Sequence, residues 1–192
     1  MIDEINNSLS LIISQTQTNL PCLMKMLALI WGIFFLTKLS GDRLLLLGIR
    51  PRRFSGLIGI LCAPFLHANF NHIFFNSIPL IVLSDFLLIN ARPYFLCVSL
   101  CIMLISGFLI WCFAKPGLHV GASGLITGYW ALLVYDIYQQ GSVTAIILGA
   151  LSLYYFAGIF LGIIPGKKGV SWEGHLFGLI AGVLTAMIKL SF

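Results

Sequence analysis

Residues 121–135 read Gly-Ala-Ser-Gly-Leu-Ile-Thr-Gly-Tyr-Trp-Ala-Leu-Leu-Val-Tyr, four small residues followed by an apolar run of helix length. A serine at the head of a buried helix lies where the unpaired backbone N–H groups of the first turn also point. Small residues in an apolar segment are, however, also typical of close packing between membrane helices. The tetrapeptide Gly121-Ala122-Ser123-Gly124 alone therefore does not separate a reactive site from a packing motif.

The composition indicates a membrane protein. Of the 192 residues, 59% are hydrophobic and 9% are charged, whereas about 25% of residues are charged in soluble domains. A domain of this size cannot bury so much apolar surface, so its solvent must be lipid. No array of basic and aromatic residues suggests a nucleic-acid partner. The cysteines lack Cys-x-x-Cys spacing and are expected to be buried thiols, and nothing in the sequence requires a metal or an organic cofactor.

The apolar runs predict an all-α polytopic membrane protein with six transmembrane helices of about 20 residues each. The expected spans are residues 20–37, 71–89, 94–113, 122–137, 142–164 and 172–190. Residues 1–19 are expected to form a short polar N-terminal tail before a six-helix membrane domain at 20–190, and Pro21 suits the start of the first helix. Charged residues and short apolar pieces alternate between the first two spans, which predicts a first loop half embedded in the membrane.

The parity of six spans brings polar residues to one level of the membrane, because the second, fourth and sixth spans begin on the same side. His72 and Asn76 lie four residues apart near the start of the second span and therefore share a helix face. Ser123 begins the fourth span and His175 the sixth, and a serine beside a histidine is a nucleophile with its general base. We expect Ser123 and His175 to be catalytic, and His72, Asn76 and the Ser123 backbone N–H to stabilise an oxyanion.

Glycines predict how the fourth and sixth spans approach each other. Gly124 and Gly128 repeat every four residues on one span, as Gly174, Gly178 and Gly182 do on the other. Such smooth ridges allow two helix backbones to come into close contact.

Taken in order, these motifs resemble those of the rhomboid intramembrane serine proteases over about residues 20–190. The resemblance rests on the His-x4-His-x3-Asn run of His67, His72 and Asn76, on the Gly-x-Ser-Gly of residues 121–124, and on the His-x2-Gly-x3-Gly of His175, Gly178 and Gly182. It implies a six-helix rhomboid-like bundle with a Ser123–His175 dyad that lacks an aspartate, and an oxyanion hole that contains His72 and Asn76. It also implies a serine endopeptidase that cleaves transmembrane segments of membrane proteins within the lipid bilayer. The residues expected to support the site structurally are His67, Gly121, Gly124, Thr127, Gly178 and Gly182.

The first loop departs from the family pattern. Family members often carry Trp-Arg in this loop, and the corresponding place here reads Ile58-Gly59. We therefore expect Arg50, Arg52 or Arg53 to hold the loop instead.

Two residues near the serine have alternative interpretations. Thr127 stands where the family often has an aromatic residue that stacks on the catalytic histidine. Its hydroxyl either fixes the His175 ring or bonds back to the carbonyl of residue 123 in its own helix. His119, in the loop before the serine, is expected to be solvated or to contact substrate.

The resemblance implies a multi-pass protein of the bacterial inner membrane whose active site opens to the non-cytoplasmic side. Eight of the eleven Lys and Arg residues, however, lie in loops on the serine side, and the positive-inside rule favours the opposite orientation. We prefer the family orientation because the motifs are more specific than a charge count. Two other functions stay open: a non-proteolytic rhomboid-like protein that binds client transmembrane helices, and a small channel or transporter that uses His72 and His175 for protons.

Overall fold

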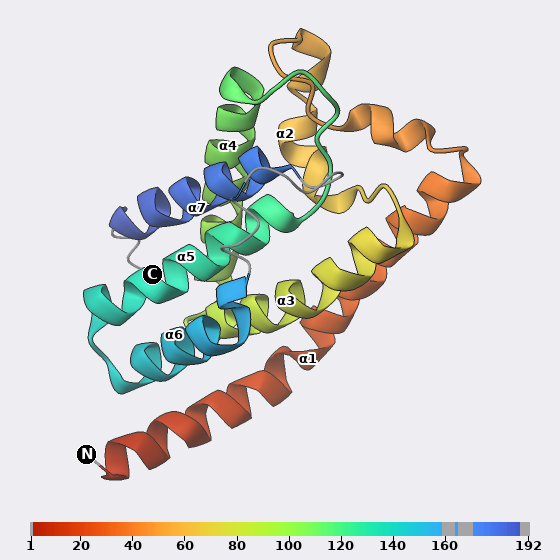
Figure 1. Cartoon of the computed structure of the whole chain (residues 1–192). Coiled ribbons are helices and arrows are strands. Elements are labelled where there is room, and N and C mark those ends of the chain that lie inside the picture. Colours follow the sequence, from red (N-terminus) through yellow and green to blue (C-terminus); the bar gives the residue numbers. More distant parts are fainter. Residues whose placement is uncertain (1, 159–163, 165–170, 189–192) are drawn as a thin grey trace.

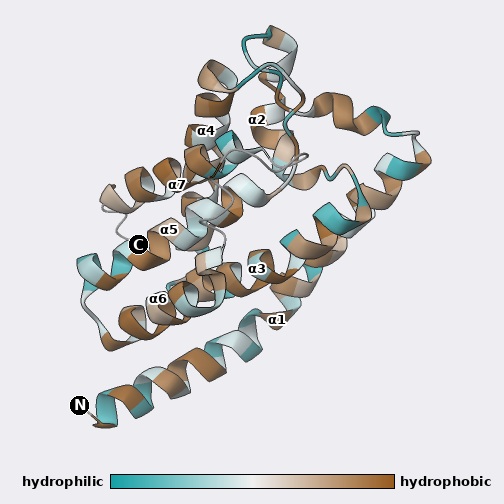
Figure 2. Ribbon diagram, viewed as in Figure 1, coloured by the Kyte–Doolittle hydropathy of each residue, from teal (hydrophilic) through white to brown (hydrophobic). Residues whose placement is uncertain are grey.

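The computed structural model describes residues 2–158, 164 and 171–188, and the regular elements in these ranges are helices (Figure 1). Their order is α1 (Ile2–Leu39), η1 (Arg43–Leu47), η2 (Phe54–Gly56), α2 (Gly59–Cys62), η3 (Ala63–Phe65), α3 (Phe70–Leu88), α4 (Arg92–Phe113), α5 (Ser123–Gln140), α6 (Val143–Phe156) and α7 (Trp172–Met187). The predicted all-α membrane bundle is confirmed. Hydrophobic residues cover most of the helices, and hydrophilic residues concentrate in the connections and at the N-terminus of α1 (Figure 2).

Helix α1 is one continuous helix from Ile2 to Leu39, and Pro21 lies inside it. The expectation that a helix begins at Pro21 is wrong, because residues 2–19 continue the same helix. A proline inside a helix removes one backbone hydrogen bond and crowds the carbonyl four residues earlier, which a membrane helix tolerates where its neighbours supply other contacts. Here Asn19 donates to Asp85 of α3 at 2.9 Å, and Thr144 of α6 donates to Ser8 at 3.1 Å. These contacts attach the polar N-terminal segment to the bundle.

By length and composition, three of the described helices can cross a membrane: α1, α3 and α4. At 1.5 Å per residue, the 38 residues of α1 extend about 57 Å, well beyond a hydrocarbon core of about 30 Å. Helices α5, α6 and α7 have 18, 14 and 16 residues and are shorter or less apolar. That the protein has six membrane spans therefore stays a prediction.

Helix α5 lies at the centre of the bundle, in contact with α3, α4, α6 and α7 (Figure 1). Its closest neighbour is α7, and the glycines explain the approach. A Cβ atom added to Gly178 would overlap the carbonyl oxygen of Gly124, and one added to Gly182 would overlap that of Gly128. Because both helices lack side chains at the crossing, the starts of α5 and α7 lie close together.

The segment between α1 and α3 exposes large apolar side chains, as expected for a loop in contact with lipid. Phe54 is 88% exposed and Ile58 is 56% exposed. Arg52 Nη1 donates to the carbonyl oxygens of Cys112 at 3.1 Å and Ala114 at 2.9 Å, at the C-terminal end of α4. Of the three arginines considered for holding the loop, Arg52 is therefore the one whose side chain joins it to α4.

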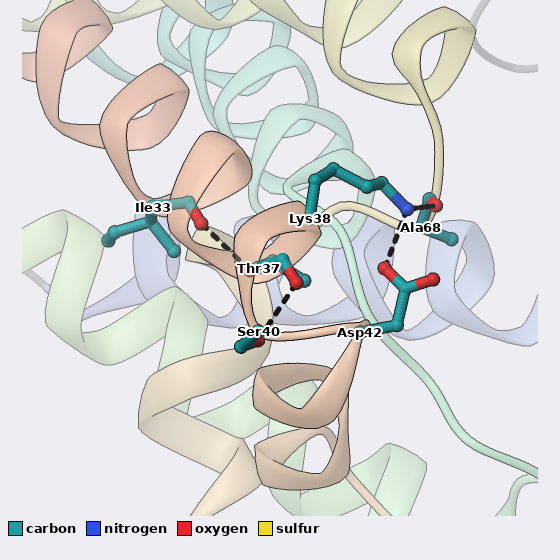
Figure 3. A network of polar contacts seen from close by, with 6 residues as sticks. All are labelled: Ile33, Thr37, Lys38, Ser40, Asp42 and Ala68. Atoms are coloured by element: carbon teal, nitrogen blue, oxygen red, sulfur yellow. Dashed lines mark hydrogen bonds and ion pairs between the residues drawn. The ribbon is translucent and has the colours of Figure 1, made fainter.

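The other end of this segment is held by the last turn of α1 (Figure 3). Lys38 Nζ donates to Asp42 Oδ1 at 2.7 Å and to the Ala68 carbonyl oxygen at 2.7 Å. Asp42 has a φ of 63°, in the left-handed region, which reverses the chain after α1. The ammonium group thus fixes the chain that leads from Ala68 into α3.

Candidate active site

A cavity of about 540 Å³ opens at the starts of α3, α5 and α7. The side chains for which the sequence predicts chemistry, His72, Asn76, Ser123 and His175, all line it and are all half-buried. The other lining residues are Ala68, Asn69, Asn71, Phe75, Leu118, His119, Val120 and Ser171. Four polar residues from three helices therefore face one space that is open to solvent.

Ser123 is the first residue of α5, directly after a constrained loop. Gly121 has a φ of 116°, and its N–H donates to the Ala63 carbonyl oxygen at 2.9 Å. A Cβ atom at Gly121 would lie 2.5 Å from Cε1 and Nε2 of His72. Glycine is required here both for the backbone angle and for the space that the His72 ring occupies, so the serine loop packs directly on that ring.

His175 lies in the first turns of α7, whose N-cap residue is Ser171. Ser171 Oγ accepts a hydrogen bond from Gly174 N–H at 3.2 Å. The Nδ1 atom of His175 is buried and has no hydrogen-bond partner in the part of the chain that the structure describes. Ser123 and His175 form no hydrogen bond with each other here, and such bonds often tighten only when substrate binds.

The aspartates of the helices are engaged away from this cavity. Asp85 accepts hydrogen bonds from Thr16 and Asn19 of α1, and Asp136 accepts one from Gln140 at 2.9 Å. Neither residue lines the cavity with His175.

His67 packs behind the two residues expected to stabilise an oxyanion. The His67 side chain is fully buried, its ring lies edge-on to that of His72 at 5.1 Å between centroids, and its Nε2 lies 3.2 Å from Asn76 Nδ2. Burial, and secondarily the neighbouring His72, lowers the pKa of His67 to about 4. The imidazole is therefore neutral at physiological pH and can accept a hydrogen bond from the Asn76 amide.

Thr127 does not contact His175 through its hydroxyl. Thr127 Oγ1 donates to the Ser123 carbonyl oxygen at 2.6 Å, the second of the two alternatives considered from the sequence. The side chain is fully buried, and its hydroxyl oxygen would lie 2.5 Å from a Cβ atom at Gly178. Thr127 is thus a small residue at the contact between α5 and α7.

His119 has partners that the sequence did not indicate. Its Nδ1 lies 3.0 Å from Ser171 Oγ and its Nε2 lies 3.1 Å from the Lys115 carbonyl oxygen. The side chain, expected to be solvated or to contact substrate, is half-buried at the open cavity and is also bonded at both ring nitrogens. Its backbone also pairs with Ile49 in an isolated antiparallel bridge. In the sequence, the one indication that His119 belongs to the site is its position four residues before Ser123.

A second, smaller cavity of about 40 Å³ reaches Ser123 from the side of the first loop and α4. Apolar residues such as Ile60, Met103 and Ile110 form most of its wall. A space of this size is suited to a methyl-sized group beside the serine.

No group of three or more His, Cys, Asp or Glu residues in the described ranges is arranged to hold a metal ion. All five cysteines are free thiols and half-buried.

Comparison with known proteins identifies the family of this chain. The rhomboid domain model matches residues 55–192. An uncharacterized protein of Mycobacterium tuberculosis is 38% identical over 171 residues, which cover 84% of this chain and 71% of that protein. A putative rhomboid protein of Acanthamoeba polyphaga mimivirus is 29% identical over 141 residues, covering 70% of this chain and 76% of that protein. The chain is therefore an integral membrane protein that belongs to the rhomboid family.

Proposed function

We propose that this rhomboid protein is an intramembrane serine endopeptidase that cleaves transmembrane segments of membrane proteins. The observation that carries the proposal is the single cavity lined by Ser123, His175, His72 and Asn76. These residues come from three helices that are separated in the sequence, and polar or ionisable groups within membrane helices are usually functional because their burial is unfavourable.

In the proposed reaction, Ser123 Oγ attacks the carbonyl carbon of the scissile peptide bond while His175 takes the hydroxyl proton. The tetrahedral intermediate then collapses, the C–N bond breaks, and His175 gives its proton to the leaving amine. An acyl group remains on Ser123. A water molecule from the open cavity, deprotonated by His175, attacks this ester and restores the serine.

His72, the Asn76 amide and the Ser123 backbone N–H are the proposed donors to the oxyanion. Ser123 is the first residue of α5, so its N–H has no acceptor within the helix. The ring of His72 packs on Gly121, two residues before the serine, which supports a location beside the developing charge. Loss of one such donor typically lowers kcat by about 100- to 1,000-fold.

The proposed substrate is a membrane-spanning segment with a small residue at the cleaved bond. A helical peptide hides its carbonyl groups in hydrogen bonds, so the segment must unwind locally before the serine can attack. The cavity of about 40 Å³ beside Ser123 supports a small side chain next to the scissile carbonyl. Helix-breaking residues after the cut would favour the unwound form.

We also propose that the protein resides in a bacterial inner membrane with its cavity open to the non-cytoplasmic side. In this orientation a reporter fused to the C-terminus lies in the cytoplasm. Activity of a C-terminal alkaline phosphatase fusion in the periplasm would overturn this orientation without affecting the proposed chemistry.

The test of the proposed activity is cleavage of a fluorogenic transmembrane peptide by the purified protein in liposomes. The wild type should cleave, Ser123→Ala and His175→Ala should not, and the matched control Ser55→Ala should behave like the wild type. Ser55 is exposed and lies outside the cavity. Equal cleavage by Ser123→Ala and wild type would refute the proposal. Binding of the peptide without cleavage by the wild type would instead favour a non-proteolytic client-binding protein.

A further inference from the structure

One hydrogen bond joins the two chain segments that carry the proposed dyad. His119 Nδ1 lies 3.0 Å from Ser171 Oγ. His119 is four residues before Ser123, and Ser171 is four residues before His175. The bond therefore connects corresponding positions ahead of the two proposed catalytic residues, and both of its members line the same cavity as the dyad.

For a neutral His119 ring, the surrounding contacts give the direction of this bond. His119 Nε2 lies 3.1 Å from the Lys115 carbonyl oxygen, which can only accept, so Nε2 must carry a proton. In the neutral ring Nδ1 is then the acceptor, and the Ser171 hydroxyl donates to it. Ser171 Oγ in turn accepts from Gly174 N–H at 3.2 Å. With a neutral His119 ring, each of these polar atoms therefore has a compatible partner.

The segment that carries His119 is itself anchored to the first loop. Ile49 N–H donates to the His119 carbonyl oxygen at 3.0 Å, and His119 N–H donates to the Ile49 carbonyl oxygen at 2.9 Å. These two bonds hold the backbone at position 119 against the first loop. The His119 side chain bonds from this anchored backbone to Ser171, the N-cap residue of α7, one turn before His175.

We propose that His119 is a positioning residue of the active site: its bond to Ser171 sets the placement of His175 relative to Ser123. This inference rests on the proposed protease function. His119 is unsuited to be the base itself because both ring nitrogens are already engaged. A displacement of about 1 Å between reacting groups can lower the rate by about 100-fold, so loss of this bond should reduce kcat and leave KM nearly unchanged.

The experiment compares His119→Phe, which keeps a ring but no polar atom, with His119→Gln, which keeps an acceptor and a donor. His119→Phe should lower kcat by roughly 10- to 100-fold, and His119→Gln should recover part of that loss. Ser171→Ala should also lower kcat, and Ser171→Thr, which keeps the hydroxyl, should restore it. Ser171→Ala removes this bond and also the cap on the Gly174 N–H, so the double variant His119→Phe/Ser171→Ala should lose little more than Ser171→Ala alone.

The outcomes separate this inference from the proposed function. If Ser123→Ala is inactive but His119→Phe retains the wild-type kcat, His119 is not a positioning residue and the protease proposal stands. Losses of kcat that multiply in the double variant would also overturn the inference, because the two residues would then act independently. If His119→Phe does not fold, His119→Leu takes its place in the comparison with His119→Gln, because Ser171→Ala also removes the cap on the Gly174 N–H and does not test His119 alone.

Discussion

Asn76 Nδ2 lies 3.2 Å from Nε2 of His67, a fully buried histidine that precedes α3. One N–H of the Asn76 amide is thereby engaged, and the second is left to face the cavity that Asn76 lines. The bond also requires an unprotonated Nε2 on His67. The orientation of a proposed oxyanion donor thus depends on the charge state of a residue outside the cavity.

His67 should make the stability of the protein sensitive to acid. Its pKa is about 4 in the folded protein, against an ordinary value of 6.5. Between these values the unfolded chain binds more protons, so the free energy of unfolding rises with pH. The contribution of neutral His67 is complete above about pH 6.5 and is lost as the pH falls toward 4, to a total of about 3 kcal/mol.

The measurement is denaturant unfolding of wild type and His67→Gln in detergent micelles at a series of pH values from 4 to 7.5. The wild type should lose more stability than the variant as the pH falls, because glutamine does not titrate. Parallel curves for the two proteins would show that His67 does not keep the low pKa that its burial produces.

The contact between α5 and α7 should tolerate no added methyl group. A Cβ atom at Gly178 would overlap the Gly124 carbonyl oxygen, and one at Gly182 would overlap that of Gly128. Gly178→Ala and Gly182→Ala should each lower the free energy of unfolding by about 1–3 kcal/mol. Gly178→Ala should also reduce cleavage, since it displaces the residue next to Ser123.

Gly32→Ala is the matched control for these variants. Gly32 lies within α1, and no atom lies within 4 Å of an added Cβ. Because alanine favours helix more than glycine does, this variant should be as stable as wild type or slightly more stable. Equal effects at Gly32, Gly178 and Gly182 would mean that close packing does not explain the glycines.

These glycines also show what could be predicted from the sequence. A repeat of four residues places small side chains on one helix face, and the parity of the spans brings helix starts to one side of the membrane. From these two rules the contact of Gly124 with Gly178 follows, and so does the convergence of Ser123 and His175 on one cavity. Both rules depend only on helix geometry, which the apolar runs define well.

Tertiary contacts account for what could not be predicted. The polar residues 2–19 and Pro21 are local signals against a long helix, but Asn19 bonds to Asp85 of α3, and that contact lies 66 positions away in the sequence. His119 likewise finds Ser171, 52 positions further along. No periodicity links residues in such pairs, so their partners become apparent only once the helices are packed.

Arg52 should hold the first loop against α4. Its guanidinium donates to the carbonyl oxygens of Cys112 and Ala114, where the end of a helix favours a cation. Because the side chain is exposed, Arg52→Gln should lower stability by only about 1 kcal/mol. Arg53→Gln removes the same charge from the next position, and its side chain makes neither bond. In thermal unfolding, Arg52→Gln should therefore melt below Arg53→Gln. The reverse order would assign the loop anchor to Arg53.

The last prediction concerns Thr127, the position where the family pattern has an aromatic residue that would stack on His175, the proposed general base. The hydroxyl instead donates to the Ser123 carbonyl oxygen, and the side chain is fully buried against Gly178 of α7. Thr127→Val keeps the shape and removes only a bond within the helix, so it should retain most of the cleavage activity, with a loss of about 1 kcal/mol in stability.

Thr127→Tyr should behave in the opposite way. Its ring has no space between α5 and α7, because Thr127 Oγ1 already fills the position that a Cβ atom at Gly178 would need. Accommodating the ring would force the two helices apart and separate Ser123 from His175. We expect the free energy of unfolding to fall by about 1–3 kcal/mol or more. Most of the activity, measured as cleavage rate per folded protein, should also be lost. A Thr127→Tyr variant as active as wild type would mean that α7 can move away from α5 without disturbing the proposed dyad, and the close glycine contact would then have no catalytic role.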